Sequence, residues 1–463
     1  MSALAVVEPG SFRDPGGRVF RAGESVFRAI TEAASEDFAR VSQSGILRKL
    51  VDQGKLIDFT DVTDQAPSLG LDQADVLLSH PRISFISYPY EWSFSLHKAA
   101  SLAHLDLHLE LLEQGFTLSD ATAYNIQFNG TRPVFIDHLS VRPYIEGEIW
   151  AGHRQFCMQF LNPLLMWSIL DLQPNHWFRG SLEGIAPEDL AKMIPLRKRL
   201  NWTVLTHVVA QAAMQNKSSR TAANSERYRN ARLPRTSFAG MLRGLRSAID
   251  KLEVPSSKTV WRNYADNTSY AAPETQAKHR FVKEMIETVR PRLLYDIGCN
   301  SGDYSKSALD AGAGKVVGFD FDHGALEIAY RRATEENLDL LPIWLDAANP
   351  SPAQGWGQTE RMGLGGRAKP DALLALAFIH HIAIGRNVPL DMALEWLLSL
   401  APSGVIEFPH KDDPMVQLLL AQRSDIFPDY HNEAFEALLS RRARIVKSTD
   451  VLPTRTLYWY ERD

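Results

Sequence analysis

The stretch of sequence that decides the fold reads Leu294-Tyr-Asp-Ile-Gly-Cys-Asn-Ser-Gly-Asp-Tyr-Ser305. It predicts a buried strand that ends in an acidic residue and enters a glycine-rich turn, from which a helix begins. Gly298 and Gly302 allow the backbone to turn tightly and to approach a ligand closely. Because ligands of open α/β sheets bind at the carboxyl ends of the strands, this turn predicts a binding site.

The residues that follow keep alternating between helix and strand patterns. Such an order predicts a parallel sheet with helices on both faces. Two runs near the end of the chain, 444–447 and 455–460, are expected to add a closing hairpin. The expected helices are 275–289, 304–311, 324–337 and 389–400, and the expected strands are 292–296, 315–320, 340–346, 371–378 and 404–408.

Two more of these strands end in an acidic residue. Asp320 ends the second strand, directly before Phe321, and a carboxylate there can accept hydrogen bonds from both hydroxyls of a ribose. Asp346 ends the third strand, where it can accept from the amino group of an adenine, with the backbone N–H of Ala347 as a donor. Acidic residues at three successive strand ends therefore predict a site for an adenosyl group.

This pattern resembles the class I S-adenosylmethionine (SAM) dependent methyltransferases. Asp296 and the two glycines fall on the family's first motif, Asp320 on its second and Asp346 on its third. The resemblance implies an α/β domain over 259–463 with a Rossmann-like, seven-stranded methyltransferase sheet, and SAM as the cofactor. An aromatic residue upstream covers the amino-acid end of SAM in many such enzymes. The implied cofactor-binding residues are Asp296, Gly298, Cys299, Asn300, Gly302, Asp320, Phe321, Asp346, Ala347 and, upstream, Tyr270.

The turn departs from the family's usual G-x-G-x-G, because its middle glycine is Asn300 here. Dinucleotide-binding oxidoreductases share the glycine-rich turn and the ribose carboxylate. However, Asp296 directly before the turn would crowd a pyrophosphate, and the acidic end of the third strand fits adenine recognition. We therefore favour a methyltransferase over an NAD-dependent enzyme.

Two histidines, His380 and His381, end the fourth strand, which faces the transferred methyl group in this fold. Imidazole is suited to acid–base work at neutral pH, and a hydroxyl acceptor needs a base whereas a phosphate or carboxylate does not. His381 or His380 is the candidate base, and the alternative is that one of them is a hydrogen-bonding neighbour and neither takes a proton. Glu407, His410 and Arg361 are the candidates for binding the acceptor, and polar loops without a binding role are the alternative interpretation.

The stretches around these histidines and after Glu407 resemble a group of bacterial two-part methyltransferases. Some members of the group are labelled as similar to rhizobial nodulation proteins. The resemblance spans the chain from about Tyr88 onward. It implies the class of enzyme and no particular acceptor.

The N-terminal region carries a second motif. Asp120, then Asn125, then Asp137 after a hairpin predicted at Asn129-Gly130, resemble the core of protein kinases and aminoglycoside phosphotransferases. The resemblance implies a kinase-like, largely helical α+β domain over 1–215. In that family the first residue is the base, and the other two hold magnesium.

This region also departs from kinases. It has no G-x-G-x-x-G loop and no clear strand-three lysine, and His138 follows Asp137 in place of Phe-Gly. Helix is expected over 26–56 and a strand over 82–88. The segment before residue 80 is short for a full nucleotide-binding lobe. A degenerate scaffold that binds the acceptor or positions the methyltransferase is the expected role, and a chance match is the alternative.

Composition excludes several classes of protein. The net charge of −5 gives no argument for nucleic-acid binding, and the sequence has no run of about 18 apolar residues that would span a membrane. Two cysteines, Cys157 and Cys299, are too few for a disulfide framework or a thiolate zinc site, so no metal is expected and a reducing cytoplasm fits best. The arginine-rich residues 216–258 are expected to form a solvated connector, with a basic lip for an anionic substrate as the alternative.

Together these observations predict a cytoplasmic, SAM-dependent methyltransferase that acts on a small-molecule or glycan-type acceptor, by O-methylation. One alternative is a bifunctional kinase–methyltransferase that acts on a phosphorylated acceptor. Another is a module that binds SAM and transfers no methyl group.

Overall fold

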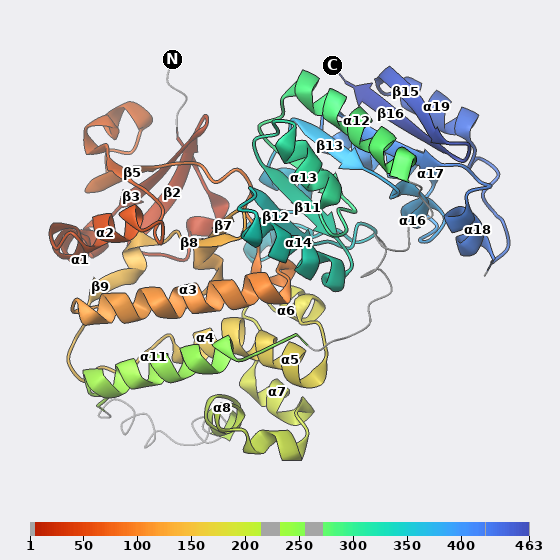
Figure 1. Cartoon of the computed structure of the whole chain (residues 1–463). Helices are drawn as coiled ribbons and strands as arrows, with labels where there is room; N and C mark the ends of the chain where they lie inside the picture. Colours follow the sequence, from red (N-terminus) through yellow and green to blue (C-terminus); the bar gives the residue numbers. More distant parts are fainter. Residues whose placement is uncertain (1–4, 214–231, 255–271, 422, 463) are drawn as a thin grey trace. The chain divides into compact units, whose positions relative to one another are not determined.

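The computed structural model describes residues 5–213, 232–254, 272–421 and 423–462, and the chain divides into two compact units (Figure 1). Each unit is built around its own sheet. Unit 1 comprises Met1–Ile83, Ser87–Ser257 and Gln354–Arg361, and unit 2 comprises Ser84–Ile86, Lys258–Ala353 and Met362–Asp463.

Unit 2 contains the predicted seven-stranded sheet. Its strand order is β12-β11-β10-β13-β14-β16-β15, which is 3-2-1-4-5-7-6 along the unit. Neighbouring strands are parallel except that β16 is antiparallel to both β14 and β15, so the closing hairpin is confirmed. The strands are β10 (Leu294–Ile297), β11 (Val316–Asp320), β12 (Leu340–Trp344), β13 (Ala372–Ala375), β14 (Ser403–Pro409), β15 (Arg444–Leu452) and β16 (Arg455–Glu461).

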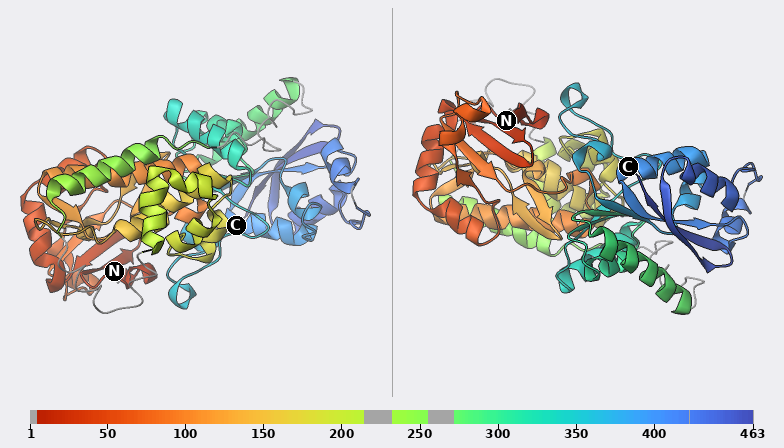
Figure 2. Two further views of the ribbon diagram at one scale, coloured as in Figure 1. Left: turned by 90° about the horizontal axis from the view of Figure 1, so that it is seen from below. Right: turned by 90° about the horizontal axis from the view of Figure 1, so that it is seen from above.

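Helices cover both faces of this sheet. Every residue of β10, β12, β13 and β14 is buried, as expected of strands that are covered on both sides. Full burial of one Leu or Val side chain contributes roughly 1.5–3 kcal/mol, so this core holds the strand ends in place. The helices are α12 (Ala272–Val289), α13 (Asp303–Asp310), α14 (His323–Glu335), α15 (Leu364–Arg367), α16 (Ile379–Ala383), α17 (Leu390–Leu400), α18 (Pro414–Leu420) and α19 (Asn432–Ser440). Figure 2 shows α12, α13 and α14 (green to teal) on one side of the sheet and α17 and α19 (blue) on the other.

Unit 1 begins with a five-stranded antiparallel sheet in the order β1-β2-β3-β5-β4, which sequence analysis did not predict. Helix was expected over 26–56, but β3 occupies its start. The strand expected over 82–88 is wrong, since those residues form no strand and the nearest one, β5, ends at His80. Phe27 and Ala29 alternate into the core of this sheet, a signal too short to stand out beside the helical spacing that follows. The elements are β1 (Val6–Val7), β2 (Gly17–Ala22), β3 (Ser25–Ile30), α1 (Glu32–Gln43), α2 (Ile46–Asp52), β4 (Thr60–Asp61) and β5 (Val76–His80).

The rest of unit 1 is mostly helical. The predicted hairpin is confirmed, since β7 (Ile126–Asn129) pairs with β8 (Arg132–Phe135). The other elements are α3 (Phe94–Glu113), β6 (Phe116–Leu118), β9 (Val141–Pro143), α4 (His153–Phe156), the π-helical η7 (Cys157–Leu161), α5 (Asn162–Leu170), α6 (Asn175–Gly180), α7 (Pro187–Met193), α8 (Trp202–Val204), the π-helical η9 (Leu205–Val209) and α11 (Arg235–Asp250). Over the described ranges, no helix combines the length and the apolar character needed to cross a membrane.

Helix α11 differs from the solvated connector expected over 216–258. It lies along α3 in Figure 1, and the two helices pack together. Its apolar residues at helical spacing are fully buried, and Arg246 forms an ion pair with Asp106 of α3. Two of the arginines that suggested a connector, Arg243 and Arg246, therefore lie on the polar side of an amphipathic helix of unit 1. The buried residues are Phe238, Leu242, Leu245 and Ile249. Residues 216–231 and 255–258 of the expected connector lie outside the described residues.

Candidate functional site

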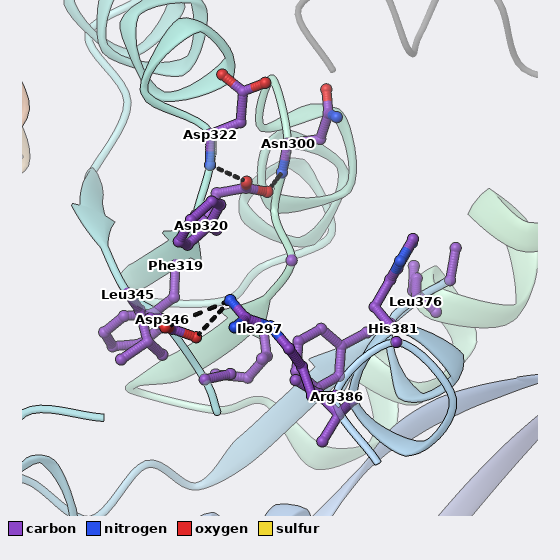
Figure 3. Close-up of a pocket in the computed structure, with 17 residues that line it drawn as sticks. Ile297, Asn300, Phe319, Asp320, Asp322, Leu345, Asp346, Leu376, His381 and Arg386 are labelled. Carbon is purple, nitrogen blue, oxygen red and sulfur yellow. Dashed lines mark hydrogen bonds and ion pairs between the residues drawn. The ribbon is translucent and has the colours of Figure 1, made fainter. Parts of the chain in front are cut away.

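A pocket opens in unit 2 at the carboxyl ends of β10, β11, β12 and β13 (Figure 3). Its volume is about 340 Å³, and both charged and apolar side chains line it. The structure thus brings a large part of the predicted site together at the predicted edge of the sheet. The predicted residues that line the pocket are Gly298, Asn300, Asp320, Phe321, Asp346, Ala347 and His381.

The turn after β10 passes through three left-handed residues, Gly298 (φ 80°), Asn300 (φ 50°) and Gly302 (φ 78°). Asparagine tolerates a positive φ better than most residues, so Asn300 fits where the family usually has glycine. A Cβ on Gly298 would lie 3.3 Å from the ring of Phe378, which also lines the pocket. Gly302 does not line the pocket. A Cβ there would lie 3.0 Å from the side chain of Leu340, so this glycine lets α13 begin close to the sheet.

Asp320, at the end of β11, holds the turn with the same carboxylate that faces the pocket. Its Oδ2 accepts a hydrogen bond from the backbone N–H of Asn300 at 2.8 Å, and its Oδ1 accepts from that of Asp322 at 2.8 Å (Figure 3). Burial raises the pKa of Asp320 to about 6, and the backbone donors oppose this shift. The carboxyl is therefore mostly ionised at pH 7 and presents a charged acceptor to a ligand.

Asp346 follows β12, and its carboxylate lies 3.4 Å from Nη2 of Arg386 (Figure 3). Arg386 lines the same pocket, and sequence analysis missed it because a lone arginine in a loop carries no local signal. Its guanidinium also lies 5.8 Å from the ring centre of Phe321. The Arg386 side chain is 48% exposed, and such pairs contribute about 1 kcal/mol or less. A ligand that competes for Asp346 can therefore displace the arginine at little cost.

Asp296 and Cys299 do not line the pocket, which differs from their expected contact with the cofactor. Asp296 is buried in β10, where its Oδ2 accepts a hydrogen bond from Ser305 Oγ at 2.6 Å. Burial raises the pKa of Asp296 to about 7. Cys299 packs against Gly318, where a Cβ would lie 2.9 Å from the sulfur. Both residues position the turn and α13 from inside the core.

The two histidines of α16 lie in different surroundings. His381 lines the pocket, whereas His380 is fully buried and does not. Their ring centres lie 4.1 Å apart. Burial lowers the pKa of both imidazoles, and that of His381 to about 4. Of the pair, His381 is the one that can touch a bound ligand, and it is neutral at pH 7.

The structure places Glu407 in the core and not in the pocket, where an acceptor-binding residue was expected. Its Oε2 lies 2.7 Å from Nζ of Lys278, and its Oε1 lies 3.2 Å from Nη1 of Arg455. Its carboxylate also accepts a hydrogen bond from the backbone N–H of Ala377 at 2.9 Å. Ala377 lines the pocket with a φ of 48°. Glu407 therefore supports the pocket wall through the backbone.

The other three predicted residues are His410, Arg361 and Tyr270. His410 does not line the pocket, and its Nε2 lies 2.9 Å from Thr456 Oγ1 on β16. Arg361 belongs to unit 1, where its guanidinium lies 4.0 Å from the ring centre of Tyr124. Tyr270 lies outside the described residues. His410 is therefore not part of the pocket wall, whereas the role of Arg361, which belongs to the other unit, stays a prediction.

Comparison with curated proteins identifies a relative of nearly the whole chain. The chain is 46% identical over 457 residues to nodulation protein NoeA of Rhizobium meliloti (strain 1021), and the match covers 98% of this chain and 95% of NoeA. The chain belongs to the NoeA family. The resemblance to proteins labelled as nodulation proteins is thereby confirmed. No family model matches the chain.

Solved structures similar to this NoeA-family chain include three methyltransferases. N-methyltransferase NodS of Bradyrhizobium japonicum WM9, in complex with S-adenosyl-L-homocysteine, matches at 11% identity and a TM-score of 0.32, over 45% of this chain and 93% of NodS. Magnesium protoporphyrin IX methyltransferase ChlM of Synechocystis PCC 6803, with the same bound product, matches at 16% identity and a TM-score of 0.31, over 45% of this chain and 100% of ChlM. The bifunctional kinase–methyltransferase WbdD matches at 16% identity and a TM-score of 0.30, over 44% of each chain. The class I methyltransferase fold of unit 2 rests on its own strand order and on its strand-end motifs.

A second group of polar side chains lies in unit 1 of this NoeA-family chain. Nδ2 of Asn125 donates to Asp120 at 3.3 Å and to Asp137 at 3.2 Å, so the three kinase-like residues meet. Ser140 Oγ donates to Asp120 at 2.9 Å. Burial and the charge of Asp137 raise the pKa of Asp120 to about 7. Arg28 of β3 forms an ion pair with Asp137 at 2.9 Å, so one of the two carboxylates already faces a cation.

Proposed function

We propose that this NoeA-family chain is a SAM-dependent methyltransferase whose active site is the pocket of unit 2. The observation that carries the proposal is that Asp320, which ends β11, and Asp346, which follows the adjacent parallel strand β12, line one pocket with the glycine-rich turn. S-adenosylmethionine is the cofactor. Asp320 would hold its ribose hydroxyls, and Asp346 with the N–H of Ala347 would hold its adenine.

The remaining lining of the pocket supports this cofactor. Its volume of about 340 Å³ falls within the range of about 300–1,000 Å³ that is usual for small-molecule sites. Ile297, Leu345 and Ile382 give it the apolar surface that an adenine ring needs. When bound, SAM supplies an activated methyl group, because its sulfonium is already a good leaving group. The chain then has to align the acceptor and, for a hydroxyl, to remove a proton.

We infer a hydroxyl of small-molecule or glycan type as the acceptor. His381 supports this inference because it lines the pocket as a neutral imidazole, the form that accepts a proton. The methyl group would pass from sulfur to the hydroxyl oxygen while the imidazole takes the proton of that hydroxyl.

Asp320→Ala is expected to weaken SAM binding by roughly 10- to 150-fold, since a hydrogen bond to a charged group contributes about 1.5–3 kcal/mol. Calorimetric titration with SAM measures the change. Asp310→Ala is the matched control, because it removes a carboxylate that is 58% exposed at the far end of α13. Unchanged affinity in a folded Asp320→Ala variant would count against the ribose assignment.

Methyl transfer is tested with methyl-labelled SAM and fractions of cell extract. S-adenosylhomocysteine that accumulates while label enters an extract component identifies an enzyme and its acceptor. Tight SAM binding with no product from any fraction would favour the alternative of a SAM-binding module without transferase activity.

A second candidate function is magnesium–nucleotide binding by unit 1, as a bifunctional kinase–methyltransferase would need. The meeting of Asp120, Asn125 and Asp137 favours it, because these residue types act as base and magnesium ligands in kinases. The ion pair between Arg28 and Asp137 argues against it, since the guanidinium already neutralises the carboxylate that would have to bind magnesium.

If unit 1 binds nucleotide, Asp137→Ala is expected to weaken magnesium-dependent ATP binding by at least about tenfold, because a charged ligand of the ion is lost. Titration of the full chain with a fluorescent ATP analogue, with and without Mg²⁺, measures this. Asp189→Ala, which removes a carboxylate 46% exposed on α7, is the control. Wild-type chain that binds no ATP in either condition would discard this candidate.

A further inference from the structure

Three side chains outside both sites meet in the helical part of unit 1: His153, Cys157 and His207. His153 is the first residue of α4, and Cys157 follows it at the start of η7, so the two lie on one helix face. His207 is in the middle of η9, far along the chain. Each residue offers one ligand atom, and these atoms all lie within 4.8 Å of one another.

Two of the three distances within this group are close to those of a tetrahedral zinc site, and the third, between Cys157 and His207, is within 4.8 Å. Zinc bonds of about 2.0–2.1 Å to nitrogen and about 2.3 Å to sulfur place two ligand nitrogens about 3.3 Å apart, and a nitrogen and a sulfur about 3.6 Å apart. Nε2 of His153 lies 3.0 Å from Nδ1 of His207 and 3.7 Å from Sγ of Cys157. A zinc ion therefore needs only small side-chain shifts to bind between them.

The backbone gives an independent observation. Cys157 and His207 both lie in π-helical segments, η7 and η9. Single π-helical turns are rare and occur frequently at functional sites, because the wider turn re-aims side chains at some cost in backbone stability. Both helices that carry the group contain such a turn where they supply a ligand.

Gln211, one turn after His207, provides the neighbour that a metal-binding histidine needs. Its Nε2 lies 2.9 Å from Nδ1 of His153 and 3.5 Å from Sγ of Cys157. Its Oε1 is buried with no hydrogen-bond partner in the described part of the chain. Turning the amide over lets this oxygen accept from Nδ1–H of His153, the type of bond that metal-binding histidines usually make through their second nitrogen. That tautomer leaves Nε2 of His153 free to bind a metal.

We propose that His153, Cys157 and His207 bind one zinc ion, which joins α4 and η7 to η9. The ion displaces the thiol proton of Cys157 to solvent and forms a zinc–sulfur bond. Two zinc–nitrogen bonds replace the hydrogen bond between the two histidines, and a water completes the usual four ligands. Cys157 is fully buried, so its thiolate would bind the ion from inside unit 1. The sequence argument against zinc counted thiolates alone, whereas two imidazoles complete the set here.

The test uses the full chain. Protein purified with zinc and freed of loosely bound metal by gel filtration is expected to retain about one zinc per chain by metal analysis. Exchange for Co²⁺ is expected to produce a thiolate-to-cobalt absorption band in the near ultraviolet. Cys157→Ser should abolish that band, whereas the matched control Cys299→Ser, at the other cysteine, should keep it. Gln211→Ala, which retains all three ligands, should weaken zinc binding by about 10- to 100-fold.

Folded wild-type chain that retains no zinc and gives no cobalt–thiolate band overturns the proposal. A band that survives Cys157→Ser and disappears with Cys299→Ser overturns it as well. If a variant fails to fold, the proposal is judged from the zinc content and the cobalt–thiolate band of the wild-type chain alone.

Discussion

A His381→Ala variant is expected to turn over about 10²- to 10⁴-fold more slowly than the wild type, the usual contribution of a positioned base, while it binds SAM with nearly unchanged affinity. The imidazole lines the pocket from α16, directly after β13. Its removal takes away the proposed proton acceptor and leaves both carboxylates that would hold the adenosyl group. The rate of S-adenosylhomocysteine formation and calorimetric titration with SAM measure the two effects separately.

The pH profile of the wild type tests the same assignment without a mutation. Burial lowers the pKa of His381 to about 4, well below the ordinary value of about 6.5. The base acts in its neutral form, so kcat should stay constant from neutral pH down to about 5 and fall as the pH drops through about 4. SAM must be saturating at each pH, because Asp320, with a pKa of about 6, becomes protonated within this range and SAM binding weakens. An ordinary imidazole would lose activity below about pH 6.5 instead. If kcat fell as the pH dropped through about 6.5, that result would contradict the buried environment of His381.

His380→Leu is the matched control for this prediction. Both ring nitrogens of His380 are buried without a hydrogen-bond partner among the residues that the structure describes. An apolar side chain of similar size should therefore cost the fold little, and turnover should stay within a few-fold of the wild type. Loss of turnover in this variant, together with normal turnover in His381→Ala, would reverse the roles of the two histidines.

The strand-end carboxylates could be predicted because their signal is local. A buried strand, an acidic end and a glycine-rich turn all occur within a dozen residues, and the parallel order then gathers such ends at one edge of the sheet. Asp320 and Asp346 accordingly share the pocket. Asp296 carries the same local signal, but it lies two residues before Gly298 and within β10. Its side chain contacts Ser305 in the core, and the motif alone does not distinguish this position from the pocket.

The features that sequence analysis missed depend on contacts between distant segments. Glu407 reads as the start of a polar loop, but it lies in β14, and its partners come from α12 and β16. In unit 1, β3 pairs with β5, although α1, α2 and β4 lie between them in the sequence. No single short stretch of sequence therefore indicates the five-stranded sheet. His153 and His207 are likewise distant in sequence, and no spacing rule joins them to Cys157.

Glu407→Ala is expected to lower the free energy of unfolding of unit 2 by about 3–5 kcal/mol, as is usual when one partner of a buried ion pair is removed. The side chains of Glu407, Lys278 and Arg455 are 0–2% exposed. Arg455 also pairs with Asp413 at 2.6 Å, so two carboxylates balance two cations in the core. Burial lowers the pKa of Lys278, and the charge of Glu407 opposes that shift. Loss of Glu407 therefore leaves one cation in excess inside the unit.

A double variant separates the ion pair from the shape of the core. Lys278→Met with Glu407→Leu removes one cation and one anion and leaves Arg455 balanced by Asp413, so it should regain the part of the stability that Glu407→Ala loses through the excess charge. The part lost with the hydrogen bond from the N–H of Ala377 should remain. Glu284→Ala removes an ion pair of unit 2 that is 41–50% exposed, and it should cost no more than about 1 kcal/mol. Hydrogen exchange of the β14 and β16 amides reads out unit 2 within the full chain, which is necessary because a two-unit chain need not unfold in one step. Glu407→Ala could instead lower the free energy of unfolding of unit 2 as little as Glu284→Ala. In that case the buried ion pairs would not be what stabilises β14, and contact with the acceptor would again be a candidate role for Glu407.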